Sequence, residues 1–320
     1  MNNSVQTGSR GFSLVEMMVV LLILSVVLGI IIPALGYARN TARKNATSAL
    51  MTQLATASAS FQLDERRLPG YFSARDMGHA DNAGAEGFSQ MCNILLDLSG
   101  GIVSTSNATP TTVQVGPHAG ARAFVAPEYI GGSTQVAGSV AKAYFRPDPK
   151  TFTIVSGRFG TANNTALPEL VDLFGTPILA WAVDEVPNST NEFVSATSTT
   201  RARFYWAQNA SALRSSALGR LGANQTTESK IGSNSSPANN ANPVVSLRAL
   251  LGAPNFPDPA NAAIPAAIRA PIVFHSAGYN GLFMGNFERG GKLAGTGAVT
   301  YLSTKDKMED FDDLIVKVSN

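Results

Sequence analysis

Glu16 is the residue whose type and position most clearly indicate chemistry. It lies near the start of an apolar block, residues 12–35, and every residue after it in the block is uncharged. A carboxylate in hydrocarbon costs about 3 kcal/mol on insertion scales, so an acid in such a segment usually has a partner and a function. The nearest cation in the sequence is Arg10. If the chain were cut after Gly11, the new α-amino group of Phe12 would be a second candidate partner.

The apolar block has the length of a helix that crosses a membrane. At a rise of about 1.5 Å per residue, residues 12–35 would extend about 36 Å, and the hydrocarbon core of a bilayer is about 30 Å thick. A buried core helix is a poor alternative, because such helices are rarely apolar on every side over this length. A plain membrane anchor is a second alternative, and a secretory signal peptide cut after Ala38 is a third.

The residues around Glu16 form a known pattern. Residues 10–16 read RGFSLVE and lead directly into the apolar run. This pattern resembles the class III leader and N-terminal helix of type IV pilins and type II secretion pseudopilins. The resemblance implies that a prepilin peptidase cleaves between Gly11 and Phe12 and then methylates the amino group of Phe12. It also implies that Glu16 recruits the subunit into a filament through the N-terminus of a neighbouring subunit.

The resemblance also implies a location and a set of partners. The partners would be the prepilin peptidase, other pilin or pseudopilin subunits, and an inner-membrane assembly platform. The chain would cross the bacterial inner membrane once, with its leader in the cytoplasm and its C-terminal head outside. Arg39, Arg43 and Lys44 follow the apolar block and favour the reverse orientation by the positive-inside rule. The processing motif overrides that rule, since its peptidase acts at the cytoplasmic face.

The helix is expected to continue beyond the membrane to about Leu63. Pro33 removes one helical hydrogen bond and should kink the helix near its exit from the membrane. Farther on, apolar residues fall at spacings of four, three and four and make one face: Leu50, Leu54, Ala57 and Phe61. The predicted organisation is a leader at 1–11, a transmembrane or filament-core helix at 12–35, an amphipathic stalk at 36–68 and an extracytoplasmic head at 69–320, with a flexible insertion at about 211–243.

The head is expected to complete an α+β fold, in which the long helix packs on an antiparallel β-sheet with large loop insertions. A short helix is predicted at Gln90–Leu98, where Cys92 would be a small core residue. Short apolar runs between turn residues predict the strands. These are Thr112–Val115, Ala123–Val125, Thr151–Val155, Ile178–Val183, Arg203–Trp206, Ile272–Phe274 and Leu314–Val318.

Two stretches extend the resemblance into the head. Residues 172–178 (DLFGTPI) resemble the D-x-W-G-x-P motif of major pseudopilins, with Phe174 in place of Trp. Residues 274–283 and 312–315 resemble the S-A-G-x-D-G-x-F loop and the D-D-I that follows it, and in type II secretion relatives this loop binds calcium. The implied ligands are Ser276, Asn280, Asp310, Asp312 and Asp313. The alternative is an ordinary Asn-Gly turn beside a solvated acidic tail, since Asn280 replaces the common Asp and calcium needs six to eight oxygens.

Composition excludes several other functions. The 320 residues carry 24 Lys and Arg against 22 Asp and Glu, a balance that does not suit binding of nucleic acid by bulk charge. The one cysteine excludes an intrachain disulfide and a cysteine-cluster metal site. His79, His118 and His275 lack a metal-ligand spacing, and no P-loop or G-x-S-x-G elbow occurs.

The sequence therefore predicts a structural protein without enzymatic activity, and no cofactor apart from the calcium that the resemblance implies. The predicted function is that of a prepilin-like subunit of a pseudopilus or type IV pilus, of the type II secretion kind. The alternative is a membrane-anchored extracytoplasmic binding or adhesion module that uses a pilin-type signal.

Overall fold

The computed structural model describes most of the N-terminal half and selected parts of the rest. The described residues are 13–99, 103–104, 112–130, 142–146, 148–155, 157–183, 206–214, 229, 231, 250, 270–284 and 311–319. The chain divides into two compact units, residues 1–45 and residues 46–320, and each is described by itself.

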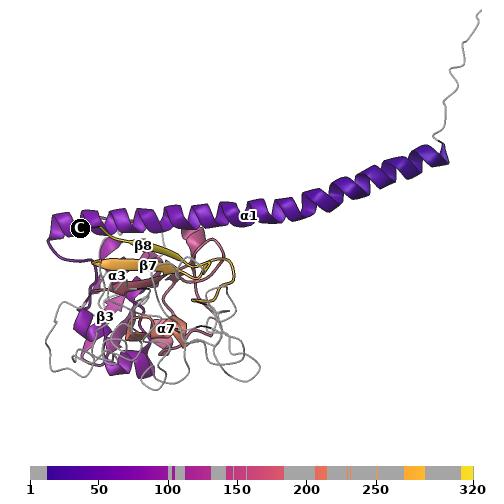
Figure 1. The fold of residues 1–320 in the computed structure, drawn as a ribbon. Helices are drawn as coiled ribbons and strands as arrows, with labels where there is room; N and C mark the ends of the chain where they lie inside the picture. Colours follow the sequence, from indigo (N-terminus) through magenta and orange to yellow (C-terminus); the bar gives the residue numbers. More distant parts are fainter. Residues whose placement is uncertain are drawn as a thin grey trace, which may run out of the picture. The chain divides into compact units, whose positions relative to one another are not determined.

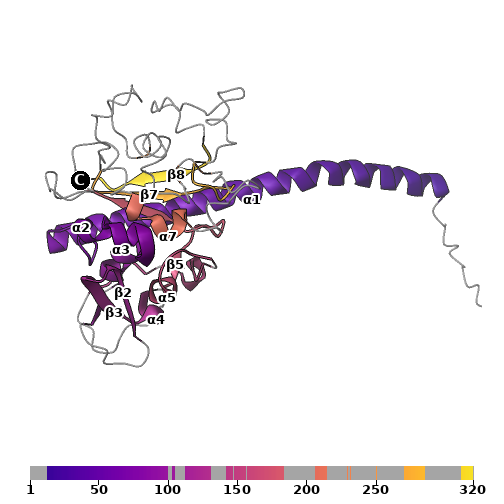
Figure 2. The ribbon, with the colours of Figure 1, turned by 90° about the horizontal axis from the view of Figure 1, so that it is seen from below.

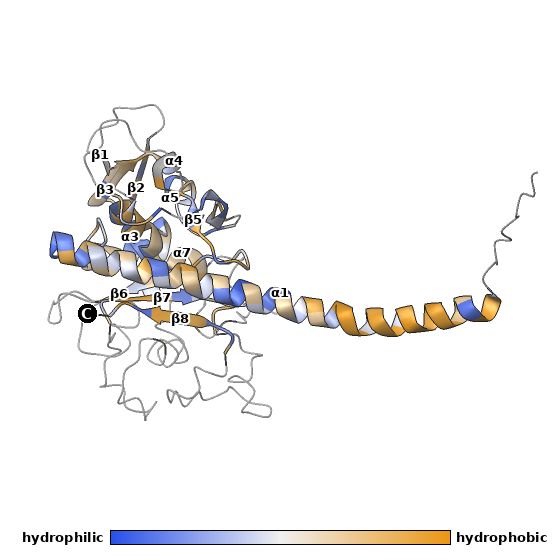
Figure 3. Cartoon of the chain, turned by 90° about the horizontal axis from the view of Figure 1, so that it is seen from above, coloured by the Kyte–Doolittle hydropathy of each residue, from blue (hydrophilic) through white to orange (hydrophobic). Residues whose placement is uncertain are grey.

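Helix α1 (Leu14–Glu65) is one continuous helix of 52 residues that begins in the first unit and ends in the second (Figure 1). Pro33 lies inside it. Every residue from 14 to 46 is exposed except Asn40, which is half-buried. Figure 3 shows that the N-terminal part of the helix is almost uniformly hydrophobic. The sequence prediction of a helix to about Leu63 is confirmed to within two residues.

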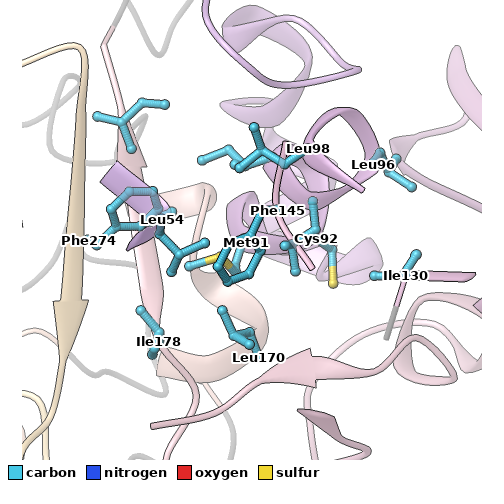
Figure 4. Close-up of a cluster of buried hydrophobic side chains, with 14 of the residues drawn as sticks. Leu54, Met91, Cys92, Leu96, Leu98, Ile130, Phe145, Leu170, Ile178 and Phe274 are labelled. Atoms are coloured by element: carbon cyan, nitrogen blue, oxygen red, sulfur yellow. The ribbon is translucent and has the colours of Figure 1, made fainter. Parts of the chain in front are cut away.

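The C-terminal part of α1 buries one face against the head. Its buried residues recur every three or four positions, as a helix that packs on one side requires: Thr47, Leu50, Met51, Leu54, Ala57, Ser58 and Phe61. Leu54 and Met51 are fully buried. Figure 4 shows Leu54 beside Phe274, Met91 and Ile178 in the main hydrophobic core. Each large apolar side chain buried in this way contributes about 1.5–3 kcal/mol, so this face fixes α1 to the head.

The central sheet consists of β6 (Leu179–Ala182), β7 (Ile272–Ser276) and β8 (Leu314–Lys317). The strands are antiparallel in the order β6-β7-β8, with Leu179 opposite His275 and Val273 opposite Lys317. All five residues of β7 are buried. Because side chains alternate along a strand, Ile272 and Phe274 join the core with α1, while Val273 joins a second core with Trp206 and helix α7 (Ala210–Leu213).

A second sheet lies on the other side of α3 (Gln90–Leu98), as Figure 2 shows. It contains β1 (Val103–Ser104), β2 (Val113–His118) and β3 (Ala121–Val125) in the order β1-β3-β2, all antiparallel. The remaining described elements are short: α2 (Ala74–Met77), a π-helix (Asn82–Glu86), α4 (Pro127–Ile130), a 3-10 helix (Pro149–Thr151), β4 (Phe152–Thr153) paired with β5 (Glu169–Leu170), α5 (Ala162–Thr165) and α7 (Ala210–Leu213).

The predicted α+β class is confirmed, and so is the helix at Gln90–Leu98. Six of the seven predicted strands overlap an observed strand, namely β2, β3, β4, β6, β7 and β8. The prediction of a strand at Arg203–Trp206 is wrong at Trp206, which is helical, and residues 203–205 lie outside the described residues. The Trp206 indole donates a hydrogen bond to the Ile231 carbonyl (2.8 Å), so tertiary burial overrides its strand propensity.

The predicted flexible insertion at 211–243 is wrong at its start. Ser211–Leu213 belong to helix α7 and are buried, as are Ser229 and Ile231. The other residues of the insertion, apart from Arg214, lie outside the described residues. The described part of the insertion is structured because it is buried in the second hydrophobic core, and its polar composition does not reveal this burial. The predicted boundaries of leader, membrane segment, stalk and head stay predictions.

Candidate functional site: the start of helix α1 and the head turns

Ser13 and Glu16 close the start of helix α1 by two reciprocal hydrogen bonds. The Ser13 backbone N–H donates to Glu16 Oε2 (2.8 Å), and the Glu16 N–H donates to Ser13 Oγ (3.2 Å). This is a capping box, which satisfies two of the N–H groups that a helix start leaves without partners. Sequence reasoning missed Ser13, although the S-x-x-E pattern before an apolar run was the signal that predicts this box.

The capping box gives the Glu16 carboxylate a hydrogen-bond donor within its own chain. The carboxylate also lies at the positive end of the helix dipole, where an anion is favoured. Glu16 Oε1 makes no hydrogen bond to any residue that the structure describes, so one oxygen is left for a further partner. Gly11 and Phe12, the predicted cleavage and methylation residues, lie outside the described residues.

The apolar part of α1 has the properties of a membrane-spanning helix. Its most hydrophobic window of 18 residues has a mean hydropathy of 3.0, and none of it is buried within the chain. The Ser25 hydroxyl donates to the Leu22 carbonyl (2.8 Å), so this polar group is satisfied inside the helix, as a lipid environment requires. By length and composition, α1 suits a single crossing of a membrane; it is the one such helix in the described part of the chain.

Asp172 organises the first of the two head turns that resemble pseudopilin motifs. Its Oδ1 accepts hydrogen bonds from the backbone N–H groups of Phe174 and Thr176 (2.9 Å each), and its Oδ2 accepts one from the Ser276 hydroxyl (2.6 Å). Burial raises the pKa of Asp172, and the Ser276 hydroxyl and the backbone donors act against that rise. The carboxylate thus connects the turn before β6 with the end of β7.

Asp312 and Asp313 hold the second turn, residues 276–281. The Asn280 N–H donates to Asp312 Oδ2 (3.0 Å), and Gly278 adopts a left-handed φ of 67° where an added Cβ would collide with the Asp312 carbonyl oxygen. The side chain of Asp313 is fully buried, pairs with His275 Nε2, and accepts the Met284 N–H (3.1 Å). Burial raises the pKa of Asp313, and the His275 contact opposes that rise.

These bonds decide how far the predicted calcium ligands fit a metal ion. The Ser276 hydroxyl, the Asn280 side-chain oxygen and Asp313 are all committed to other groups. Asp312 Oδ1 is buried without a hydrogen-bond partner, and Asp310 lies outside the described residues. Within the ranges that the structure covers, no group of three or more His, Cys, Asp or Glu side chains is arranged to hold a metal. Asp312 Oδ1 is thus the one uncommitted side-chain oxygen among the described ligands, against the six to eight oxygens that calcium takes, and the calcium site stays a prediction.

The three histidines have structural partners. The rings of His79 and His118 stack with centroids 4.4 Å apart, and His118 Nε2 contacts Asp76 Oδ1 (3.0 Å). The Nδ1 atoms of both rings accept a backbone N–H, from Asp81 and Gly120 respectively. The pair joins the α2 segment to the β2–β3 hairpin. Sequence reasoning could not find this contact, since the two residues are far apart in the chain.

A comparison with known families assigns the N-terminal segment. The family model described as the prokaryotic N-terminal methylation motif matches residues 7–32. Residues 7–32 are a prokaryotic N-terminal methylation motif. The match includes Gly11, Phe12 and the capping box, and it ends directly before Pro33. No curated protein and no solved structure matches the chain.

The methylation motif supports a protein of the type IV pilin and pseudopilin class, as the sequence resemblance implied. Proteins that carry it are typically structural rather than enzymatic. The motif implies processing by a prepilin peptidase and assembly with other pilins, and the apolar part of α1 is compatible with a single membrane anchor.

Proposed function

We propose that this chain is a structural subunit of a pseudopilus or type IV pilus, of the type II secretion kind. The methylation motif at residues 7–32 is the observation that carries the proposal. The precursor would lie in the bacterial inner membrane with its leader in the cytoplasm and its head outside. Prepilin peptidase would cleave between Gly11 and Phe12 and methylate Phe12, and the subunit would then assemble through α1 on an inner-membrane platform.

Cleavage would create the partner for Glu16. It frees the amino group of Phe12 directly before Ser13, the residue that caps α1. When helices of two copies lie side by side, the amino group of one can approach Glu16 of the other through Oε1, which the capping box does not use. A buried charge without a partner is costly, so this pairing would select one axial register between the helices.

The exposed part of α1 would form the shared interior of the filament. Its side chains from Leu14 to Ile32 are almost all large and apolar, and none is covered within the chain. Lipid tails and neighbouring helices are similarly apolar, so transfer from the membrane to a helical bundle gains little hydrophobic free energy. Helix packing and the Glu16 pair would therefore determine the arrangement, while the work of extraction comes from outside this chain.

Mass spectrometry of the mature N-terminus tests the proposal most directly. We expect a chain that begins at methylated Phe12. A chain that begins at Arg39 would identify an ordinary signal peptide and would refute the proposal.

A second experiment tests the assembly role of Glu16. We expect Glu16→Ala to be processed normally but not to enter filaments, because the partner of the incoming amino group is lost. Ser25→Ala is the matched control, since it also removes a polar group from the apolar helix but one bonded only to its own backbone. Normal function of Glu16→Ala without any filament would indicate the anchored binding module instead.

A further inference from the structure

The neck of helix α1, defined here as residues 36–45, carries all the charge on a long stretch of that helix. Between Glu16 and Asp64 the sequence contains no other aspartate or glutamate, and its only cations are Arg39, Arg43 and Lys44. An acid three or four residues away is what compensates a cation within a helix, and none is present at those positions. The counter-charge for the neck must therefore come from outside α1.

The side chains of the neck are accessible. Every residue of the neck is exposed except Asn40, which is half-buried, and Tyr37 is 77% exposed. The three cations form no ion pair with any residue that the structure describes. The neck thus presents two guanidinium groups, one ammonium group and one phenol to whatever surrounds it.

The position of the neck on α1 decides what surrounds it. The apolar segment ends at Leu35. At about 1.5 Å per residue, Arg39 lies about 6 Å beyond that end and Lys44 about 14 Å beyond it. A polar headgroup layer about 5–7 Å thick covers each face of the hydrocarbon core, and long cationic side chains can lean back into it. Tyr37 lies at the level where tyrosine is enriched in membrane proteins.

The chemistry of the neck suits the phosphate groups of that layer. A guanidinium binds phosphate with two parallel hydrogen bonds, and an ammonium binds it as a point charge. Each lysine or arginine near an anionic membrane surface strengthens binding by a factor of about five. The positive-inside rule describes how cations bias insertion, whereas this attraction acts once the helix is in place, so the two do not conflict.

We propose that the neck binds the headgroups of anionic phospholipids through Tyr37, Arg39, Arg43 and Lys44. The inference rests on the proposed function, in which α1 crosses the membrane and the neck lies at its outer face. The contact sets the depth of α1 in the bilayer, and it must break when the subunit leaves the membrane for the filament. A second copy of this chain is the competing partner for the three cations.

Fluorescence quenching by headgroup-labelled lipids tests the contact. Ala42→Cys places a thiol in the neck at an exposed position and changes no charge. The native Cys92 is fully buried, and burial raises the pKa of its thiol to about 12, so a fluorescent maleimide reacts at position 42. The full chain is placed in vesicles of phosphatidylcholine and phosphatidylglycerol, with a spin label on the headgroup of one lipid or the other.

We expect spin-labelled phosphatidylglycerol to quench the neck fluorophore with an apparent affinity at least about five times that of spin-labelled phosphatidylcholine. The preference should fall as salt rises from about 0.01 M to about 1 M, because the Debye length shortens from about 30 Å to about 3 Å. A preference that does not respond to salt would contradict an electrostatic contact.

Variants of the neck test the chemistry. We expect glutamine at positions 39, 43 and 44 together to abolish the preference, and Arg39→Lys with Arg43→Lys to keep most of it, since the charge remains. The matched control is Arg66→Gln, which also removes an exposed arginine but lies beyond the last residue of α1 and should leave the preference unchanged. Protection of Cys92 from the maleimide shows in each variant that the head is folded.

Two results would overturn the inference. One is equal quenching by the two lipids, or a preference that survives the loss of all three cations. The other is a photoreactive residue at position 42 that labels a second copy of the chain in the vesicles instead of lipid.

The vesicle assay needs no filament, and this separates the inference from the proposed function. If the lipid preference is absent while the mature chain begins at methylated Phe12 and forms filaments, the lipid contact is wrong and the proposed function stands. If the mature chain begins at Arg39, it lacks the apolar segment, and the proposed function fails together with the contact.

Discussion

The ion pair between Arg158 and Glu169 offers the sharpest test of how the head is held together. Their side chains are 2% and 5% exposed, and Arg158 Nη2 lies 2.9 Å from Glu169 Oε1. Arg158 Nη1 also donates to the Leu167 carbonyl (3.1 Å). Replacing Arg158 with Met would keep most of the side-chain volume but leave the Glu169 charge buried without its partner.

The expected cost is large compared with the stability of a domain. Removing one partner of a buried ion pair costs about 3–5 kcal/mol, and the loss of the bond to Leu167 adds about 1 kcal/mol. The free energy of unfolding of a domain is only about 5–15 kcal/mol, so Arg158→Met should lower it by about a quarter or more. Arg158→Met combined with Glu169→Leu should lose less than Arg158→Met alone, because no charge is left buried.

Cys92 provides the assay. Its thiol is fully buried and donates weakly to the Pro168 carbonyl (3.6 Å), beside Glu169, so it reacts with a maleimide only when the head opens. Labelling of the full chain in detergent at increasing urea gives the unfolding free energy without any introduced cysteine. A loss below about 1 kcal/mol for Arg158→Met, or a double variant less stable than Arg158→Met, would refute the reasoning.

Three further predictions concern the stability of the head; the first two can be measured by the same labelling assay, and the third by the fluorescence of the buried Trp181 and Trp206 in urea, because a maleimide needs the thiolate. Leu54→Ala should cost about 2–5 kcal/mol because it leaves a cavity under α1, whereas Leu63→Ala, at a 75% exposed position, should change stability by about 0.5 kcal/mol or less. Gly278→Ala should destabilise the head more than Gly175→Ala. Both positions have positive φ, but only at Gly278 would the new Cβ collide with the Asp312 carbonyl. Equal losses of unfolding free energy in the two variants would contradict this reason. For Asp76, burial acts to raise the pKa, but hydrogen bonds from Ser73 and His118 together hold the pKa below its ordinary value of 3.8. The unfolded chain therefore takes up this proton first on acidification, so Asp76 stabilises the fold above pH 3.8, and Asp76→Asn should lower stability more at about pH 6 than at about pH 3.

Local pattern was enough to predict the two longest described helices, α1 and α3. The spacing of Leu50, Leu54, Ala57 and Phe61 predicted the buried face of α1, because a helix packed on one side must repeat its apolar residues every three or four positions. Gln90–Leu98 was predicted to the residue, and its boundary is set by Ser89, whose hydroxyl accepts the Cys92 N–H (3.1 Å). Strand β2 runs past its predicted end at Val115, because an irregularity in register before His118 lets it continue through Gly116 and Pro117.

Long-range polar contacts were beyond prediction. Asn82 is fully buried, and its side-chain amide donates to the carbonyls of Met77, Phe88 and Ala207, the last of them 125 residues away. An asparagine in a Gly- and Ala-rich stretch is typical of a surface turn, and nothing in the local sequence indicates a hydrogen-bond partner so far along the chain. The pairing of His79 with His118 and the helical state of Trp206 were missed for the same reason.

At the candidate site Glu16 was predicted, while its capping partner Ser13 was missed although the S-x-x-E pattern that indicates it is local as well. Glu16 stood out because a carboxylate in an apolar segment is rare, yet its need for a neighbour's amino group was inferred as if it had no partner in its own chain. In the structure, Ser13 already satisfies one of its oxygens. The capping box gives the carboxylate a hydrogen bond within its own chain but supplies no cation. Under the proposed function, the amino group of an incoming copy would add a second bond at Oε1 or displace the Ser13 N–H. In either case the pair would act through register.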